Sequence, residues 1–254
     1  MIHPTAIIES TAKLGANVKV GPWTYIGHDV EIGDNCEISS HVVVRGPTTI
    51  GKNNRIFQFS SIGEDCQDKK FAGEPTRLVI GDNNVFRECL TVHRGTIQDQ
   101  SLTQIGSDNL FMAYVHVAHD CVIGDHNIFA NATTLAGHVH VGSHVILGGF
   151  TGVHQFCKIG SHAFTAVSSV VVQDVPPYVM AQGHNAVPRT INSEGLRRRG
   201  FSAEQIQNIK RAYKLLYRQG LTLQTALSDM RAIDAPELQV LIDFIEHSKR
   251  GIIR

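Results

Sequence analysis

The sequence predicts a mainly β fold, a parallel β-solenoid followed by a small α-helical domain. Three observations support this. An aliphatic residue or Phe falls on every sixth position from residue 105 to 159, the same period holds from residue 2 to 62, and the apolar period becomes helical beyond about residue 183. A period of six fits neither an amphipathic helix, which needs about 3.6, nor an isolated half-buried strand. It is typical of a solenoid in which three short strands and three corners close one coil.

The repeated slots carry large side chains that we expect to point inward. They are Ile2, Ile8, Leu14, Val20, Ile26, Ile32, Ile38, Val44, Ile50, Ile56 and Ile62, then Ile105, Phe111, Val117, Ile123, Phe129, Leu135, Val141, Leu147, Val153 and Ile159. Apolar residues make up 42% of the chain, too few for such a run by chance. Each fully buried slot side chain should contribute roughly 1.5–3 kcal/mol.

Taken in order, residues 1–62 form uninterrupted coils, and the pattern then lapses in a polar segment near 63–79. It resumes at Ile80, Phe86 and Val92 before a second lapse near 96–104. We expect both segments to be loops ejected from one wall, where solenoid insertions tend to build binding sites. The coils then continue, with Thr165 in an apolar slot, until the sequence Asp174-Val175-Pro176-Pro177 ends the repeat. The predicted β-solenoid domain therefore covers 1–187.

The remaining segment, 188–254, is predicted to be an α-helical domain. Ser202 and Gln205 form a capping box ahead of apolar residues on one helical face, and Gly220 follows as a stop. Two further helices are expected, from Thr222 to about 233 and from Pro236 to about 247. This segment holds 12 Lys or Arg and 7 Asp or Glu, so it is basic, with a net charge of +5.

Composition excludes several classes of protein. Lys plus Arg equals Asp plus Glu at 23 each, so no overall charge attracts nucleic acid. No segment approaches the length of apolar residues that a transmembrane helix requires, and the opening Met1-Ile2-His3-Pro4 lacks the basic region followed by an apolar run that is typical of a secretory leader. We therefore expect a cytoplasmic protein. Three of the five cysteines, Cys36, Cys121 and Cys157, lie two residues before a slot, where a small buried side chain suffices.

The histidines of the later coils form an arrangement of their own. With 18 residues per coil, positions 18 apart lie one above the other at about 4.8 Å. One column contains His119, Gly137 and Gln155, and the neighbouring column contains Asp120, His138 and Phe156.

An imidazole beside a carboxylate, with a glycine backbone one layer away, suits proton transfer with an oxyanion donor. From spacing alone three interpretations stay open: a catalytic site with His119 as base, a ladder of surface histidines, and a metal site.

Several motifs between the slots resemble those of one family. They are His-Val-Ala-His-Asp (116–120), Leu-Ala-Gly-His-Val (135–139), Val-His-Gln-Phe-Cys (153–157), Asp-Val-Pro-Pro-Tyr (174–178), Glu-Gly-Leu-Arg-Arg-Arg-Gly-Phe (194–201), Gly-Glu-Pro-Thr-Arg (73–77) and Thr-Val-His-Arg-Gly-Thr (91–96). Together they resemble the acyl-carrier-protein–UDP-N-acetylglucosamine O-acyltransferases, which begin lipid A biosynthesis. The resemblance covers essentially the whole chain.

This resemblance implies a left-handed parallel β-helix and a homotrimer with active sites between adjacent subunits. It implies that His119 is the general base for the 3-hydroxyl of UDP-N-acetylglucosamine and that Asp120 orients it. The hydroxyl then attacks the thioester of an (R)-3-hydroxyacyl carrier protein directly, while the backbone of Gly137 stabilises the oxyanion. Neither a metal nor another cofactor is implied.

Substrate contacts implied by the resemblance are Asp68, Lys70, His93, His116, His138, His154, Gln155, Asn192, Glu194, Arg198 and Arg199. Arginine suits a diphosphate because its fork makes paired charge-assisted hydrogen bonds, and the basic C-terminal segment suits an acidic carrier protein. Val167 matches the residue that limits acyl length in the family. We expect it to shorten the groove and to favour acyl groups of about ten to twelve carbons.

Three alternatives remain: a metalloenzyme like the γ-class carbonic anhydrases, a non-catalytic hexapeptide scaffold, and a sister acyltransferase acting on nitrogen in a later lipid A intermediate. The sequence also leaves open an acceptor with nitrogen at the sugar 3-position.

Overall fold

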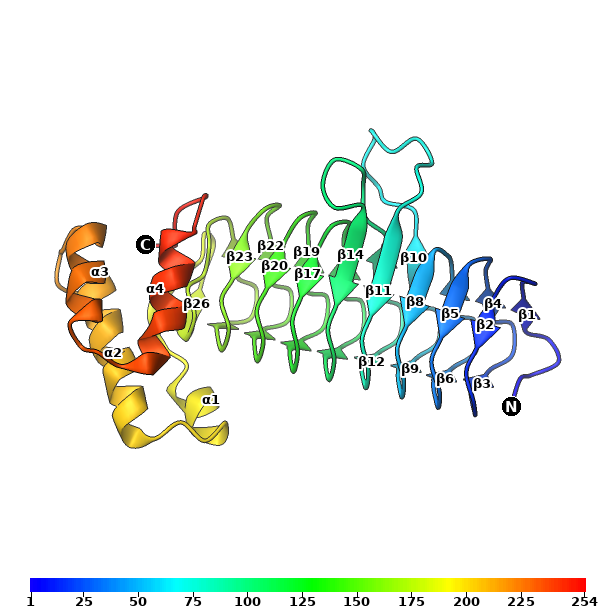
Figure 1. Ribbon diagram of the computed structural model, residues 1–254, viewed down its shortest axis with the longest axis horizontal. Helices are drawn as coiled ribbons and strands as arrows, with labels where there is room; N and C mark the ends of the chain where they lie inside the picture. The colour runs from blue at the N-terminus through cyan, green and yellow to red at the C-terminus, as the bar shows by residue number, and fades with distance from the viewer.

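The computed structural model describes residues 1–254, and it confirms the predicted left-handed parallel β-helix with C-terminal helices (Figure 1). Short strands stack into three sheets that run the length of the solenoid. Sheet 1 contains β1 (Ile7–Ile8), β4 (Tyr25–Ile26), β7 (Val43–Val44), β10 (Ser61–Glu64), β13 (Thr91–His93), β16 (His116–Val117), β19 (Thr134–Leu135), β22 (Gly152–Val153) and β25 (Val170–Val171).

The other two sheets complete the triangular coil. Sheet 2 contains β2 (Lys13–Leu14), β5 (Val30–Ile32), β8 (Thr48–Ile50), β11 (Arg77–Ile80), β14 (Leu102–Ile105), β17 (Val122–Ile123), β20 (His140–Val141) and β23 (Lys158–Ile159). Sheet 3 contains β3 (Lys19–Val20), β6 (Glu37–Ile38), β9 (Arg55–Ile56), β12 (Val85–Phe86), β15 (Leu110–Phe111), β18 (Ile128–Phe129), β21 (Ile146–Leu147), β24 (Phe164–Thr165), β26 (Val179–Gln182) and β27 (Val187–Ile191).

The slot residues form the core, as predicted. Most strands pair in parallel with the strand of the next coil, as Ile8 does with Ile26, so each slot lies directly above the one three slots earlier. From the second coil onward every slot side chain is buried, whereas Ile2 is exposed because no coil lies beneath it. The predicted small buried cysteines, Cys36, Cys121 and Cys157, are at most 1% exposed.

The three corners differ in the side chains that they present. We call the corner between sheets 1 and 2 the loop corner, because both inserted loops leave the solenoid there. The corner between sheets 3 and 1 is the aromatic corner, which carries the exposed side chains of Trp23, Phe59, Tyr114 and Phe150. The corner between sheets 2 and 3 is the stacked-histidine corner, where His126, His144 and His162 stack with ring centroids 4.8 and 4.9 Å apart.

The two loops span residues 65–76 and 94–101, whereas the sequence pattern placed them near 63–79 and 96–104. The first loop is shorter because Gly63 and Glu64 extend β10 and Arg77 begins β11, and the second is displaced because β13 ends at His93 and β14 begins at Leu102. Sheet 1 resumes the same pairing beyond both loops, since Ser61 pairs with Thr91 and Thr91 pairs with His116, and the one irregularity is a bulge at Gly63 in β10. Each loop therefore only lengthens its own coil, and the stacking continues undisturbed past it.

The solenoid ends in a hairpin. β26 adds to β24 in parallel, and β27 then pairs with β26 antiparallel, so residues 187–191 are a strand in the segment where the sequence indicated only helices. Five helical segments follow: α1 (Ser193–Arg198), α2 (Ala203–Tyr217), α3 (Leu223–Arg231), the 3₁₀ turn η1 (Pro236–Leu238) and α4 (Gln239–Glu246).

The helix start signals act as predicted. Ser202 caps α2 in a reciprocal capping box with Gln205, and Thr222 caps α3. Pro236 begins the last helical segment with η1 rather than with the α-helix itself. None of the helices is both long and apolar enough to cross a membrane.

Candidate active site

Consecutive coils each contribute a different piece to the loop corner. The two loops leave it in adjacent coils, and the next three coils place His119–Asp120, Gly137–His138 and Gln155–Phe156 above them. The predicted columns are confirmed by backbone hydrogen bonds. The His138 N–H donates to the His119 carbonyl at 3.0 Å, and the Phe156 N–H donates to the Gly137 carbonyl at 3.1 Å. The predicted catalytic residues therefore lie next to one another.

His119 is held by the buried carboxylate of Asp120. Its Nδ1 lies 2.9 Å from Asp120 Oδ2. Because an ionised carboxylate only accepts hydrogen bonds, the Nδ1 atom carries a proton and Nε2 remains for the substrate. Nε2 has no hydrogen-bond partner within the chain and is not sealed from solvent. The pair is thus oriented as a general base requires.

The second loop holds Asp120 in turn. Thr96 donates to the carboxylate from its hydroxyl at 2.6 Å and from its N–H at 2.9 and 3.1 Å. Burial raises the pKa of the Asp120 carboxyl, but the hydrogen bonds from His119 and Thr96 outweigh it and leave that pKa below its ordinary value. Asp120 therefore remains ionised beside His119. Sequence reasoning missed Thr96, because no periodicity constrains a loop residue.

Gly137 leaves room for the reactive edge of the imidazole. A Cβ on Gly137 would lie 2.5 Å from His119 Cε1 and 2.6 Å from Nε2, so any side chain there would displace the imidazole. The Gly137 N–H donates to no group of the chain. A free donor beside the base nitrogen is what an oxyanion site requires.

His138 lies between an aromatic ring and two carboxylates. It stacks on Phe156 with centroids 4.3 Å apart and planes 8° apart, and it meets the His119 ring edge-on at 5.0 Å. Its Nδ1 lies 2.9 Å from Asp99 Oδ2. Asp99 belongs to the second loop, so sequence periodicity offered no signal for this contact.

The other histidines extend the site along sheet 1. His93 and His116 meet edge-on at 5.0 Å, and His116 Nδ1 lies 2.7 Å from the Thr91 hydroxyl. Burial, with smaller contributions from His116, His119 and Arg94, lowers the pKa of His93 to about 4. Burial also lowers the pKa of His116, so both rings favour the neutral form. His154 is exposed, with Nδ1 3.1 Å from the Gln155 carbonyl.

Asp68 and Lys70 lie together in the first loop, where the Lys70 N–H donates to Asp68 at 2.9 Å. Arg94, at the start of the second loop, is 7% exposed, and its guanidinium donates to the Gly63 carbonyl and to Asp65. This buried cation ties the bases of the two loops together.

The C-terminal candidates lie at a different corner. Asn192 caps α1 and donates to the His162 carbonyl at 3.0 Å. Burial is the main cause that lowers the pKa of His144, and the nearby charge of Arg199 lowers it further. Glu194 pairs with Arg198 on the exposed face of α1. One chain therefore places these residues at the stacked-histidine corner, apart from His119. Val167 lies at the aromatic corner and is 67% exposed.

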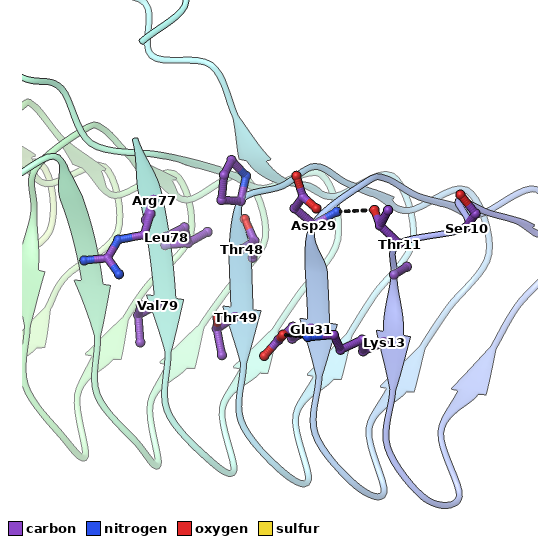
Figure 2. Close-up of a pocket in the computed structure, with 12 residues that line it drawn as sticks. Ser10, Thr11, Lys13, Asp29, Glu31, Thr48, Thr49, Arg77, Leu78 and Val79 are labelled. Atoms are coloured by element: carbon purple, nitrogen blue, oxygen red, sulfur yellow. Dashed lines mark hydrogen bonds and ion pairs between the residues drawn. The ribbon is translucent and has the colours of Figure 1, made fainter. Parts of the chain in front are cut away.

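A separate pocket of about 530 Å³ lies on the N-terminal half of sheet 2 (Figure 2). Lys13 and Glu31, which form an ion pair, line it together with Arg77. None of the candidate catalytic residues lines this pocket, so it is not part of the site at His119.

These contacts bear on two chemical alternatives, a metal site and a cysteine nucleophile. Ligand atoms of His119, Asp120 and His138 lie within 4.8 Å of one another, close enough for a cation. The Nδ1 atoms of His119 and His138, however, each lie 2.9 Å from a carboxylate oxygen. This arrangement favours hydrogen bonding and proton transfer over metal binding. Burial raises the pKa of Cys121 to about 12, so its thiol is a poor nucleophile.

Comparison with known proteins first shows the class of protein to which the solenoid belongs. The family model described as "Bacterial transferase hexapeptide (six repeats)" matches residues 11–46 and 102–137, so the solenoid is that of a hexapeptide transferase. The model described as "Udp N-acetylglucosamine O-acyltransferase; Domain 2" matches residues 174–253. An acyl-[acyl-carrier-protein]–UDP-N-acetylglucosamine O-acyltransferase of Saccharophagus degradans is 56% identical over 255 residues, covering 100% of this chain and 99% of the relative.

Solved structures agree with these matches. LpxA from Acinetobacter baumannii is 52% identical with a TM-score of 0.97, covering 100% of this chain and 99% of that one. The UDP-N-acetylglucosamine acyltransferase of Francisella novicida is 45% identical with a TM-score of 0.98, covering 100% and 94%. The chain belongs to the acyl-[acyl-carrier-protein]–UDP-N-acetylglucosamine O-acyltransferase family. This favours acyl transfer over the carbonic anhydrase-like and scaffold interpretations.

Proposed function

We propose that the protein transfers an (R)-3-hydroxyacyl group from acyl carrier protein to the 3-hydroxyl of UDP-N-acetylglucosamine, the first step of lipid A biosynthesis. The observation that carries the proposal is the His119–Asp120 pair, with an open Nε2 against Gly137, in a chain 56% identical over its full length to an enzyme named for this reaction. A carrier-protein donor also implies that the reaction takes place in the cytoplasm.

The chemistry follows from the atoms at the loop corner. His119 Nε2 takes the proton of the sugar 3-hydroxyl as its oxygen attacks the thioester carbonyl. The charge then rests on the carbonyl oxygen, where the free Gly137 N–H can donate to it. Asp120 stabilises the imidazolium that forms. When the tetrahedral intermediate collapses, the C–S bond breaks and the imidazolium returns the proton to the carrier-protein thiolate.

The contribution of each step can be bounded. General base catalysis typically supplies about 10²–10⁴-fold. One oxyanion donor is worth about 10²–10³-fold. No covalent acyl-enzyme is needed, in keeping with the buried, weakly acidic Cys121 thiol.

We further propose that the enzyme is a homotrimer whose site is completed by a neighbouring subunit. Asn192 and Arg199 are proposed to bind UDP-N-acetylglucosamine, yet within one chain they lie at the stacked-histidine corner rather than beside His119. A second copy would bring its α1 against the loop corner of the first. The aromatic corner supplies apolar surface for such an interface, since Trp23 and Phe150 are 64% and 67% exposed.

The remaining contacts divide by chemistry. The arginines of α1 suit the diphosphate, Asp68 and Lys70 suit the polar groups of the sugar, and the histidines of sheet 1 line the approach to His119. Val167 is proposed to close the acyl groove, and its exposed side chain would be covered by the neighbouring subunit and the acyl chain.

The test is transfer of a 3-hydroxyacyl group from carrier protein to UDP-N-acetylglucosamine by wild type and by His119→Ala, with trimer size and folding checked in parallel. We expect turnover by wild type and a loss of about 10²-fold or more in an intact His119→Ala trimer. Equal turnover by both proteins would remove His119 from the base role. Wild type that is inactive on this acceptor but active on its 3-amino analogue would reassign the acceptor.

A further inference from the structure

The loop corner contains a second histidine–carboxylate pair beside the first. His138 Nδ1 lies 2.9 Å from Asp99 Oδ2, the same distance that separates His119 Nδ1 from Asp120. The His138 side chain is 11% exposed and that of Asp99 35%, so water only partly competes for the bond. The mechanism proposed for His119, Asp120 and Gly137 assigns no role to Asp99 or to its contact with His138.

We propose that Asp99 is a positioning residue that acts through His138, by fixing the proton on Nδ1 and so directing Nε2 toward the substrate. The inference rests on the proposed function, since it concerns the same site. An ionised carboxylate can only accept, so a bond of this length requires the proton on Nδ1. The Nε2 of His138 has no partner in the chain and is not sealed from solvent, which leaves it available to the substrate.

Asp120 cannot do this for His138. Its Oδ2 lies 3.9 Å from His138 Nδ1, beyond hydrogen-bond distance. That oxygen already accepts from His119 at 2.9 Å and from the hydroxyl and N–H of Thr96. A second acceptor is therefore needed if both imidazoles are to be oriented at once, and Asp99 supplies it.

Apart from its edge-on contact with His119, the ring of His138 is otherwise constrained only in its plane. Stacking on Phe156, with planes 8° apart, prevents tilting, but a flat face is equally satisfied when the ring flips over about the Cβ–Cγ bond. The Asp99 bond is the contact that distinguishes Nδ1 from the opposite edge of the ring.

The second loop is built to hold Asp99 there. Thr96 binds Asp120, and the Ser101 N–H donates back to the Thr96 carbonyl at 3.0 Å, so the segment between them is a compact turn. Two residues of this loop thus each hold one carboxylate-to-histidine contact, Thr96 through Asp120 and Asp99 directly. One short loop sets the orientation of both imidazoles.

The kinetic test compares Asp99→Ala, Asp99→Asn and, as matched control, Gln100→Ala, the exposed next residue of the same loop. Because a hydrogen bond to a charged group is at stake, we expect Asp99→Ala to lose about 10- to 100-fold in kcat/KM for UDP-N-acetylglucosamine. In Asp99→Asn the new amide oxygen still accepts from Nδ1–H, so this variant should recover most of the loss, and Gln100→Ala should match wild type. An Asp99→Ala enzyme equal to wild type would overturn the proposal.

A double-mutant cycle separates positioning from a general loop effect. In a His138→Ala background, Asp99→Ala should change kcat/KM by less than about twofold, because its only partner is gone. An undiminished loss in that background would mean that Asp99 acts elsewhere and would overturn the proposal.

A spectroscopic readout does not depend on turnover. In histidine-¹⁵N-labelled protein, the resonances missing from His138→Ala identify His138, and its Nδ1 should be the protonated nitrogen in wild type. Asp99→Ala should move the proton population toward Nε2, and an unchanged tautomer would overturn the proposal. If wild type fails to transfer acyl groups, the proposed function fails, and this measurement alone decides the role of Asp99.

Discussion

The Gly137→Ala substitution tests how closely the base is packed. The backbone of Gly137 is not in the left-handed region, so alanine can adopt it, and the effect comes from the added Cβ alone. That Cβ would lie 2.5 Å from His119 Cε1, whereas ordinary contact begins at 3.4 Å. The imidazole must therefore move by about 0.9 Å, either away from the substrate or out of its bond with Asp120.

A misplacement of about 1 Å at a reacting group can cost about 10²-fold in rate. We expect kcat to fall by this factor, with a much smaller change in KM for UDP-N-acetylglucosamine, measured by transfer from acyl carrier protein. Gly149→Ala is the matched control for folding, since Gly149 holds the same turn position at the aromatic corner and a Cβ there meets only the Asn131 carbonyl at 3.4 Å. Gly137→Ala that keeps kcat within about threefold of wild type would refute the reasoning.

Three further predictions concern the same framework. Thr96→Val keeps its shape but removes the hydroxyl that donates to Asp120, so the unfolding free energy should fall by about 1.5–3 kcal/mol in urea titration, together with a lower kcat. Val167→Gly should shift the preferred donor to longer acyl chains in a ladder of carrier-protein thioesters; an unchanged preference would exclude the groove-closing role. Burial lowers the pKa of His93 and of His162 to about 4 in the folded state, against 6.5 unfolded, so the unfolded chain binds more protons between these values. Stability should therefore be lost as pH falls from about 6.5 toward 4, by at most about 3 kcal/mol per histidine, and His162→Phe should weaken the dependence measured by urea unfolding.

The coils were predictable because one short-range rule repeats. A slot at every sixth position determines which side chains point inward, and the constant length of the coil then places His119 beneath Gly137 without any knowledge of the loops. The loop contacts had no such rule. Thr96 and Asp99 lie in a segment without a period, and their contacts with Asp120 and His138 depend on how that segment folds back.

The C-terminal residues show a second limit. Capping signals located α2 and α3, because a cap is a local interaction between residues close in the chain. The position of Asn192 at the His162 carbonyl depends instead on the β26–β27 hairpin, which turns the chain back along the solenoid. No pattern in the sequence relates that hairpin to a particular corner.

The inserted loops also separate two kinds of sequence change. The functional residues of this corner form a linear array with a fixed pitch, in which the number of the coil determines the position of each residue. Adding residues within a strand or a tight corner would shift every later slot off the core. Each loop, in contrast, leaves the solenoid and returns the chain to the same place in the stack of coils. The residues of one loop that contact the substrate can thus change independently of the other loop, while the stacking of coils that positions His119 stays the same.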